Sequence, residues 1–367
     1  MLRFVKKNDL ESPMSVLKTA KLLTLNVSKS IGVFNALRQS DWRKHQLLIL
    51  AYHGVSIDDE HLWDPDLYIT PEQFRRRMQA LKDSGCHVLL LADALQKLWN
   101  GTLPTCSVVL TFDDGSADFY SRVFPILREF DYPATVYLTS YYSNYNRPVF
   151  DVMCSYLLWK GRDRVLDVSG LIEGCGSFDL TSTPVRESAV KAIREFSRGK
   201  RFSARQKDEL LNALAERLQL DYQTILSKRI LHLLSADELA ILAEAGVDIQ
   251  LHTHRHHAPK TRDSFLLELQ ENKNFITKFT KLPQHFSYPH GLYAPCYAPW
   301  LGDCDVTSAT TCEPGLATNQ SNPYKLPRLV DTSSLSLIEL EGWISGFSKF
   351  LPRKPTKTGS DIPPHYY

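Results

Sequence analysis

Two adjacent carboxylates stand at the end of an apolar run in the middle of the chain. Residues 108–112 are β-branched, aliphatic or aromatic, which is typical of a buried strand, and Asp113, Asp114 and Gly115 follow directly. Neighbouring side chains on an extended backbone point to opposite sides, so the two carboxylates face different partners. One of them could bind a metal ion while the other accepts a proton.

A second reactive group is a run of four histidines within residues 252–257. It follows residues 247–251, which we expect to form a strand. His252 and His256 are four positions apart, a spacing that brings two side chains to one side of a turn or of a first helical coil. Imidazole is the commonest protein ligand of first-row divalent metals, so this pair is a candidate metal site. His254 is an alternative partner, and His257 a weaker one.

Two histidines and one carboxylate together leave coordination positions open, which is typical of a catalytic metal site rather than a structural one. Such a metal polarises a carbonyl oxygen and lowers the pKa of water, and the second aspartate can take the water's proton. His53, at the end of the apolar residues 47–52, could donate a proton to a leaving amine. By itself His53 fits a structural role equally well. The combination predicts amide hydrolysis.

Strands that alternate with helices must carry these groups. Thr70, Pro71 and Gln73 form a helix start with a capping box, and Gly85 ends that helix. Further strands are expected at 87–91, 134–139, 247–251 and 285–288, and further helices at 92–100, 117–130, 235–246 and 263–281. This alternation indicates an α/β fold with parallel strands, in which active-site groups collect at the carboxyl ends of the strands.

Residues from about 150 to 234 interrupt the alternation. We expect a helical insertion over one rim, with charged helices at 185–196 and 204–218 and irregular chain before them. The basic residues between these two helices indicate a solvated face more than a ligand site.

The amino-terminal residues 1–46 form a separate basic segment. Residues 14–39 have an amphipathic helical pattern, and no acidic residue occurs from 12 to 40. This helix packs on the barrel of residues 47–350 or, alternatively, lies on an anionic membrane. The tail, residues 351–367, is rich in proline and lysine and is expected to be disordered.

The composition excludes several classes of protein. The chain has 367 residues and is 43% hydrophobic and 23% charged. Its net charge of +2 is too small to indicate a nucleic-acid-binding protein. Its seven cysteines are odd in number and form no CxxC pair, so we expect free thiols. With neither a recognisable signal peptide nor a long apolar run, the sequence favours a cytoplasmic location, peripheral at the inner membrane if the first helix binds lipid.

Four short motifs together resemble the polysaccharide deacetylase family, also called the NodB-homology or carbohydrate esterase 4 hydrolases. They are AYHG (51–54), TFDDG (111–115), HTHRH (252–256) and YPHG (288–291). Their order resembles the circularly permuted branch that acts on poly-N-acetylglucosamine, in which the acid histidine comes first. The resemblance implies a distorted TIM-like (β/α) barrel.

The resemblance also implies residue roles. Asp113 would be the general base, Asp114 with His252 and His256 would bind a divalent metal, and His53 would be the general acid. Zinc is the first choice of metal, with cobalt, nickel or manganese as alternatives. The backbone amide after Pro289 would help to hold the oxyanion.

This chain lacks two residues that the family pattern usually has, and other residues must take their roles. The family usually has an arginine where this chain has Ser287, and we predict that Arg328 orients the catalytic aspartate instead. The segment 335–350 contains no histidine, so His53 must supply the acid, with His290 as the fallback. Tyr288, His290 and Gly291 of the YPHG motif are predicted to line the substrate.

The expected function is hydrolysis of a linear amide: removal of N-acetyl groups from an amino-sugar-containing glycan or from a lipid-linked or nucleotide-linked sugar precursor. One alternative is a deacylase of a small non-sugar amide. The other is a catalytically silent glycan-binding protein.

Overall fold

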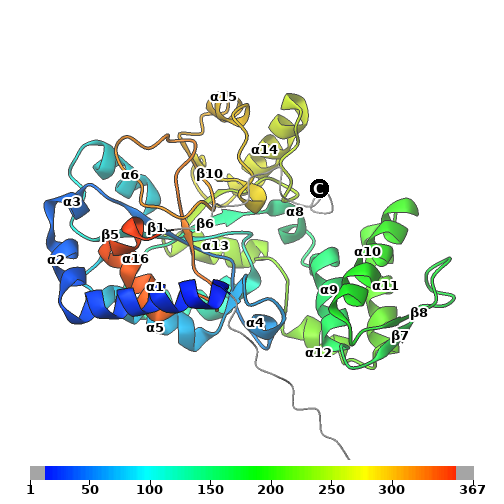
Figure 1. The fold of residues 1–367 in the computed structure, drawn as a ribbon. Helices are drawn as coiled ribbons and strands as arrows, with labels where there is room; N and C mark the ends of the chain where they lie inside the picture. Colours follow the sequence, from blue (N-terminus) through cyan, green and yellow to red (C-terminus); the bar gives the residue numbers. More distant parts are fainter. Residues whose placement is uncertain (1–12, 353–367) are drawn as a thin grey trace, which may run out of the picture.

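A parallel sheet of eight strands organises the computed structural model, which describes residues 13–352 (Figure 1). The strand order is β11-β10-β9-β6-β5-β1-β12, and β4 pairs with the amino-terminal part of β5. The strands are β1 (Leu48–Tyr52), β4 (His87–Val88), β5 (Ser107–Phe112), β6 (Thr135–Leu138), β9 (Asp248–Leu251), β10 (His285–Ser287), β11 (Ser308–Thr310) and β12 (Leu329–Val330).

The sheet curls into a distorted barrel, as predicted. A parallel bridge between Thr310 and Leu326 links β11 to the chain that leads into β12, so the two ends of the strand order meet. Every residue of β1 and β5 is buried, because helices cover the outside of the sheet and side chains fill its inside. This explains why both strands are continuous apolar runs in the sequence.

The register of β1 and β5 brings two predicted site residues to one edge. Tyr52 pairs with Phe112 at the carboxyl ends of the strands, and the Asp113 amide donates a hydrogen bond to Tyr52 O at 2.9 Å. His53 and Asp113 therefore leave neighbouring strands at the same level.

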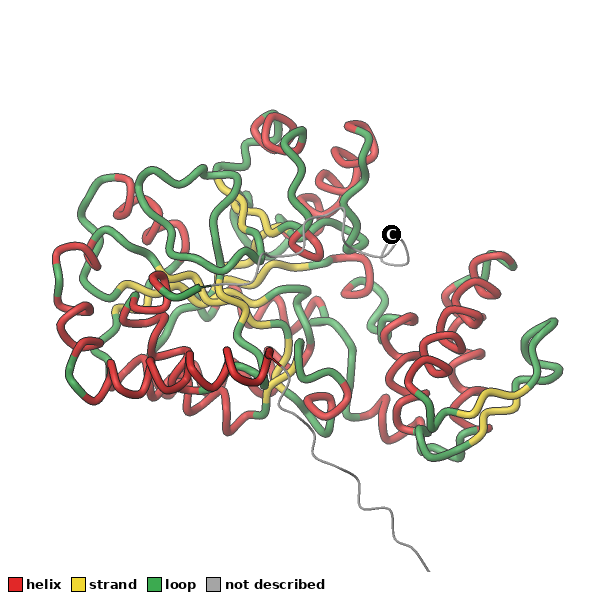
Figure 2. Tube along the Cα trace, viewed as in Figure 1, coloured by secondary structure: helices red, strands yellow, loops and turns green. Residues whose placement is uncertain are grey.

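Helices surround the sheet (Figure 2). They are α4 (Glu60–Trp63), α5 (Pro71–Asp83), α6 (Leu91–Trp99), α7 (Phe124–Phe130), α8 (Ser140–Ser143), α13 (Ala236–Glu244), α14 (Arg262–Ile276), α15 (Tyr297–Gly302) and α16 (Leu337–Ser345), with short 3-10 turns at Pro289–Gly291 and Phe347–Phe350. A small parallel pair, β2 (Gly54–Val55) with β3 (Tyr68–Ile69), lies outside the main sheet. The sequence patterns missed α15 and α16.

Two predicted helices differ from those observed. The helix expected at 117–130 consists of a π-helical turn, Phe119–Val123, followed by α7. Pro125 lies at this junction and has no N–H for the preceding turn, which accounts for the break. The helix expected at 263–281 ends at Ile276.

The insertion builds a helical unit beside the barrel (Figure 1). It contains α9 (Phe150–Lys160), α10 (Thr183–Gly199), α11 (Ala204–Arg217), α12 (Tyr222–Ser227) and the antiparallel pair β7 (Val165–Asp167) and β8 (Ser177–Asp179). Its apolar side chains form a cluster separate from that of the barrel. It meets the barrel near α4, where Tyr156 and Lys160 bond to Asp59 at 2.5 and 2.7 Å. The sequence predicted α10 and α11, whereas the supposedly irregular chain before them contains α9 and the β-pair.

The amino-terminal segment is not the single helix predicted for residues 14–39. It forms α1 (Pro13–Ser30), α2 (Val33–Gln39) and α3 (Asp41–Lys44), and the break falls at Gly32, whose φ of 84° is left-handed. Helix α1 packs on α16 through ion pairs of Lys21 with Glu339 (2.8 Å) and Lys29 with Glu341 (2.6 Å).

Within residues 13–352, no helix is both long enough and apolar enough to cross a membrane. Of the tail predicted to be disordered, residues 353–367 lie outside the described part of the chain.

Candidate active site

A tight turn after β5 separates the two carboxylates. Asp114 and Gly115 both have left-handed backbones, with φ of 68° and 76°. A Cβ atom on Gly115 would lie 2.4 Å from Leu138 Cδ1, so only glycine fits there. The Gly115 amide donates to Asp113 O (2.8 Å), and the Thr139 amide donates to Asp114 O (3.1 Å). The backbone thus holds the two side chains in different directions, as the sequence suggested.

Asp113 is buried against Arg328, which reaches it from the start of β12. Arg328 donates from Nη1 to Asp113 Oδ1 and from Nη2 to Oδ2, both at 2.7 Å. Burial raises the pKa of Asp113, but the charge and hydrogen bonds of Arg328 outweigh this and lower the pKa to about 2. Asp113 is therefore ionised at neutral pH, the state that a proton acceptor needs.

The remaining donors of Arg328 are also satisfied. Nε donates to Thr311 O (3.0 Å), Nη1 to Thr111 Oγ1 (3.1 Å) and Nη2 to Ser287 Oγ (2.9 Å). Ser287 is the position at which the family pattern has an arginine. Here its short side chain contacts the guanidinium that comes from another strand, a role that sequence reasoning did not assign to it.

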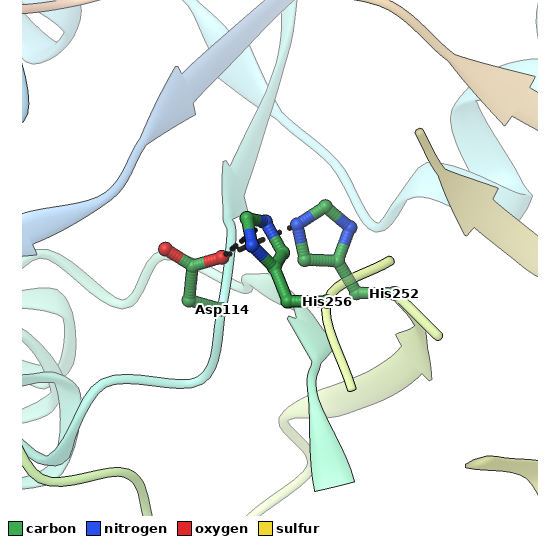
Figure 3. Close-up of side chains that lie close together, drawn as sticks. All are labelled: Asp114, His252 and His256. Atoms are coloured by element: carbon green, nitrogen blue, oxygen red, sulfur yellow. Dashed lines mark ion pairs between the residues drawn. The ribbon is translucent and has the colours of Figure 1, made fainter. Parts of the chain in front are cut away.

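The second carboxylate faces two imidazoles (Figure 3). Asp114 Oδ1 lies 3.3 Å from His252 Nε2 and 3.2 Å from His256 Nε2. The three ligand atoms all lie within 4.8 Å of one another. Residues from β5 and from the loop after β9 therefore converge on one point.

The hydrogen bonds of this cluster fit a divalent cation. His252 Nδ1 donates to Ser287 O (2.8 Å), because a carbonyl can only accept, so Nε2 is the nitrogen that faces Asp114. Burial lowers the pKa of His252, but Asp114 and Asp113 outweigh it and raise the pKa. Burial lowers the pKa of His256 to about 3, so this ring is neutral. Two imidazole nitrogens and a carboxylate around a shared point are a suitable donor set for a metal ion.

The other two histidines of the run lie outside this cluster. His254 Nδ1 is 2.8 Å from Ser140 Oγ, and its ring packs edge-on against Tyr141. His257 is exposed. The left-handed residues Thr253 and His256, with φ of 63° and 56°, bring His256 back beside His252 by a turn rather than a helix.

Asn272 supports the histidine loop and was missed by sequence reasoning. It lies in the middle of α14 and is fully buried. Its Oδ1 accepts the His252 amide (3.0 Å), while Nδ2 donates to Leu138 O and Ser140 Oγ, both at 2.9 Å. It thereby ties the loop to the end of β6. The sequence signal was weak: one asparagine on the apolar side of a helix.

His53 lies within electrostatic reach of both carboxylates, whose pKa values it lowers. Its Nδ1 is buried and has no hydrogen-bond partner in the described structure. The segment after it is fixed by Asp118, whose Oδ1 accepts the Val55 amide at 2.9 Å and whose Oδ2 accepts the Ser116 hydroxyl. Burial raises the pKa of Asp118 to about 7. Sequence reasoning did not single out this third aspartate.

The YPHG segment borders the cluster, but Tyr288 does not line the substrate side as predicted. The Tyr288 ring is buried in the core and its hydroxyl donates to Tyr324 O (3.0 Å), so this side chain cannot line a substrate. His290 is exposed, with its ring 4.4 Å from that of His256. Gly291 has a φ of 68°, and a Cβ there would lie 3.0 Å from Cys312 Cβ.

Comparison with known proteins agrees with these motifs. The polysaccharide deacetylase family model matches residues 100–165. The chain is 32% identical over 121 residues to the poly-β-1,6-N-acetyl-D-glucosamine N-deacetylase of Escherichia coli K12, covering 31% of this chain and 18% of that protein. It is 27% identical over 162 residues to the enzyme of the same name from Staphylococcus epidermidis, covering 39% and 56%. The matches thus span less than two thirds of either relative.

Solved structures share the fold. IcaB from Ammonifex degensii superposes with a TM-score of 0.54 at 15% identity, over 83% of this chain and 99% of that chain. The Streptococcus pyogenes deacetylase PplD, in complex with acetate, gives 0.52 at 18% identity, over 80% and 96%. The barrel predicted from the sequence is therefore confirmed. The family match and the curated relatives agree with the resemblance that the motifs indicated: over these parts of its length the chain is similar to polysaccharide deacetylases.

Proposed function

We propose that this protein is a metal-dependent N-deacetylase acting on a glycan that contains acetylated amino sugars. The observation that carries the proposal is the convergence, at one edge of the barrel, of an ionised buried aspartate with an Asp-His-His donor set. Asp113 and Arg328 supply a fixed proton acceptor, and Asp114, His252 and His256 supply the ligands.

When bound, a divalent metal, with zinc as the first choice and cobalt, nickel or manganese as alternatives, would polarise an amide carbonyl and acidify water. The chain's own residues do the rest. Asp113 accepts the proton of the attacking water at a carboxylate oxygen, and Arg328 keeps that oxygen in place. His53 donates a proton to the departing amine, which then leaves as the free amino sugar.

The exposed side of the cluster is where a polymer would bind. His290 lies there beside His256 and offers a polar group to a sugar hydroxyl. The names of the curated relatives describe enzymes that deacetylate poly-N-acetylglucosamine, which favours an acetylated amino-sugar chain as substrate. A lipid-linked or nucleotide-linked sugar precursor is a more specific substrate within this proposal.

The test is release of acetate from acetylated glucosamine oligomers by protein loaded with zinc. We expect acetate together with an equal amount of free amine. A small amide without a sugar, such as an N-acetyl amino acid, serves as the comparison substrate. Faster release from that amide would favour the small-amide deacylase, and binding of the oligomer without acetate release would favour the silent binding protein.

We propose further that α1 contacts an anionic lipid surface. Leu23, Val27 and Ile31 follow one another at four-residue spacing and are 61%, 56% and 70% exposed, although they are apolar. The other side of α1, with Lys21, Leu25 and Lys29, packs on α16, so this stripe is left exposed to solvent. The helix has no acidic residue that would repel an anionic membrane, and of its three lysines Lys21 and Lys29 are paired with α16. A cytoplasmic location, peripheral at the inner membrane, would follow and stays a prediction.

A further inference from the structure

We propose that Cys86 and Cys106 form a peroxide-reactive dithiol at the amino-terminal end of the barrel. Their Sγ atoms lie 2.8 Å apart. Cys86 directly precedes β4 and Cys106 directly precedes β5, and the His87 amide donates to Cys106 O across the pair (3.2 Å). A disulfide requires a separation of about 2.05 Å, so the sulfurs need to approach by less than an ångström.

A buried arginine gives this pair its chemistry. Arg43 is fully buried, and its guanidinium donates to three backbone carbonyls, those of Ile344 (3.1 Å), Gln46 and Ser107 (3.4 Å). Within residues 13–352 it makes no ion pair with a carboxylate. A buried cation without a counter-charge is costly, and a thiolate at Cys106 would supply that charge.

The two thiols are differentiated. The hydrogen bond from Cys86, followed by the charges of Arg43 and Arg38, lowers the pKa of Cys106. The same hydrogen bond raises the pKa of Cys86. Cys106 also borders a pocket and directly precedes Ser107, whose carbonyl accepts from Arg43, so Cys106 takes the role of nucleophile and Cys86 that of the resolving thiol.

We infer that a small oxidant enters beside Cys106. A pocket of about 410 Å³ is lined by Cys106 together with Arg38 and His87, among other mostly polar residues. Hydrogen peroxide is small enough for this space, and the basic lining stabilises an anionic leaving group.

The reaction is balanced with peroxide as the oxidant. The Cys106 thiolate attacks one peroxide oxygen, the O–O bond breaks, and hydroxide leaves, which gives a sulfenic acid. Cys86 sulfur then attacks Cys106 sulfur, the S–O bond breaks, and the hydroxyl group leaves with the Cys86 proton as water. The two sulfurs have lost two electrons, and peroxide has gained them.

The disulfide would join the end of α5 to the start of β5, the strand whose far end carries Asp113 and Asp114. It would also remove the counter-charge of Arg43. Oxidation therefore changes the support of the strand without touching the ligand cluster.

The experiment exposes the reduced protein to stoichiometric peroxide, blocks remaining thiols with N-ethylmaleimide and maps peptides without reduction. We expect a cross-linked peptide joining Cys86 to Cys106 as the first product, with the other five of the seven cysteines alkylated. In Cys86→Ser the reaction should stop at a sulfenic acid on Cys106, which dimedone captures. The exposed Cys296 provides the matched control, since Cys296→Ser should form the cross-link at an unchanged rate.

Oxidation of Cys296 or any other thiol before this pair would overturn the proposal, as would recovery of both alkylated cysteines after one equivalent of peroxide. The peptide map uses the unaltered protein, so it does not depend on the folding of a variant. It reads sulfur chemistry alone and is independent of the proposed deacetylase activity.

Discussion

Arg328 donates one hydrogen bond to each carboxylate oxygen of Asp113, both at 2.7 Å, although the two residues are 215 positions apart in the chain. Both side chains are buried, with exposed fractions of 0% and 3%. A planar guanidinium that bonds both oxygens fixes the plane of the carboxylate as well as its charge. The orientation of the proposed base thus depends on a residue from the last strand.

We expect Arg328→Lys to lower kcat by about 10- to 100-fold, because an ammonium keeps the charge but cannot bond both oxygens. Bound metal, measured by elemental analysis, should stay at the wild-type level. Ser287→Ala removes one bond to Arg328 and serves as the milder comparison. Wild-type kcat in Arg328→Lys would contradict the orienting role.

The two adjacent aspartates should respond differently to the same change. Asp113→Asn should abolish acetate release while metal binding persists, whereas Asp114→Asn should lose both, because only Asp114 belongs to the donor cluster. Acetate release and metal content are measured on the same preparations. Equal loss of metal in both variants would show that these roles are misassigned.

Metal binding should raise thermal stability through His256 and not through His254. After chelation, zinc at about 100 times its Kd should stabilise the wild type by about 2.7 kcal/mol, seen as a higher Tm. His256→Ala should lose most of this shift, and His254→Ala should keep it, since His254 is bonded to Ser140. The assignment fails if the two variants exchange these outcomes.

The buried Asp118 should make stability depend on pH. Its pKa is about 7 in the folded protein against 3.8 for an ordinary aspartate, so the folded state binds more protons between these values. The free energy of unfolding therefore falls as pH rises from 3.8 towards about 7 and then levels off.

Asp118→Asn cannot ionise, and its amide can still accept from Val55 and donate to Ser116. Relative to wild type it should gain up to about 4 kcal/mol between about pH 4 and about pH 9, measured by urea unfolding. The exposed Asp163→Asn is the control and should show no such trend. A wild-type protein that loses no stability against Asp118→Asn over this range would refute the buried, protonated state.

Vesicle flotation tests the lipid contact of α1. Val27→Glu should weaken binding to vesicles of anionic lipid by at least about tenfold, because a carboxylate replaces an apolar group in the stripe. Leu267→Glu is the matched control, since Leu267 is an exposed apolar residue on α14, at 57% against 56% for Val27. If both variants float like wild type, α1 does not contact lipid.

Local patterns predicted much of the site. The apolar residues before Asp113 and the four-residue spacing of His252 and His256 depend on near neighbours in the chain, so sequence periodicity shows them. The same patterns predicted alternating strands and helices, while the barrel followed from the family resemblance and is confirmed by the similar solved structures.

Long-range contacts were harder to predict from the sequence. Asn272 and Asp118 act through hydrogen bonds to distant segments, for which the sequence carries no periodic signal. Arg328 was proposed only because the family's arginine was missing, and its contact with Ser287 could not be foreseen. Gly32 broke the first helix because glycine adopts a left-handed φ without steric cost, which the amphipathic pattern around it does not show.

The insertion buries its own apolar side chains, so it can be engineered separately from the barrel. Substitutions at its buried residues between Phe150 and Leu231 perturb a core that β1, β5 and β9 do not share. This unit can therefore diverge, or be replaced by grafting, while the strands that precede Asp113 and His252 keep their packing.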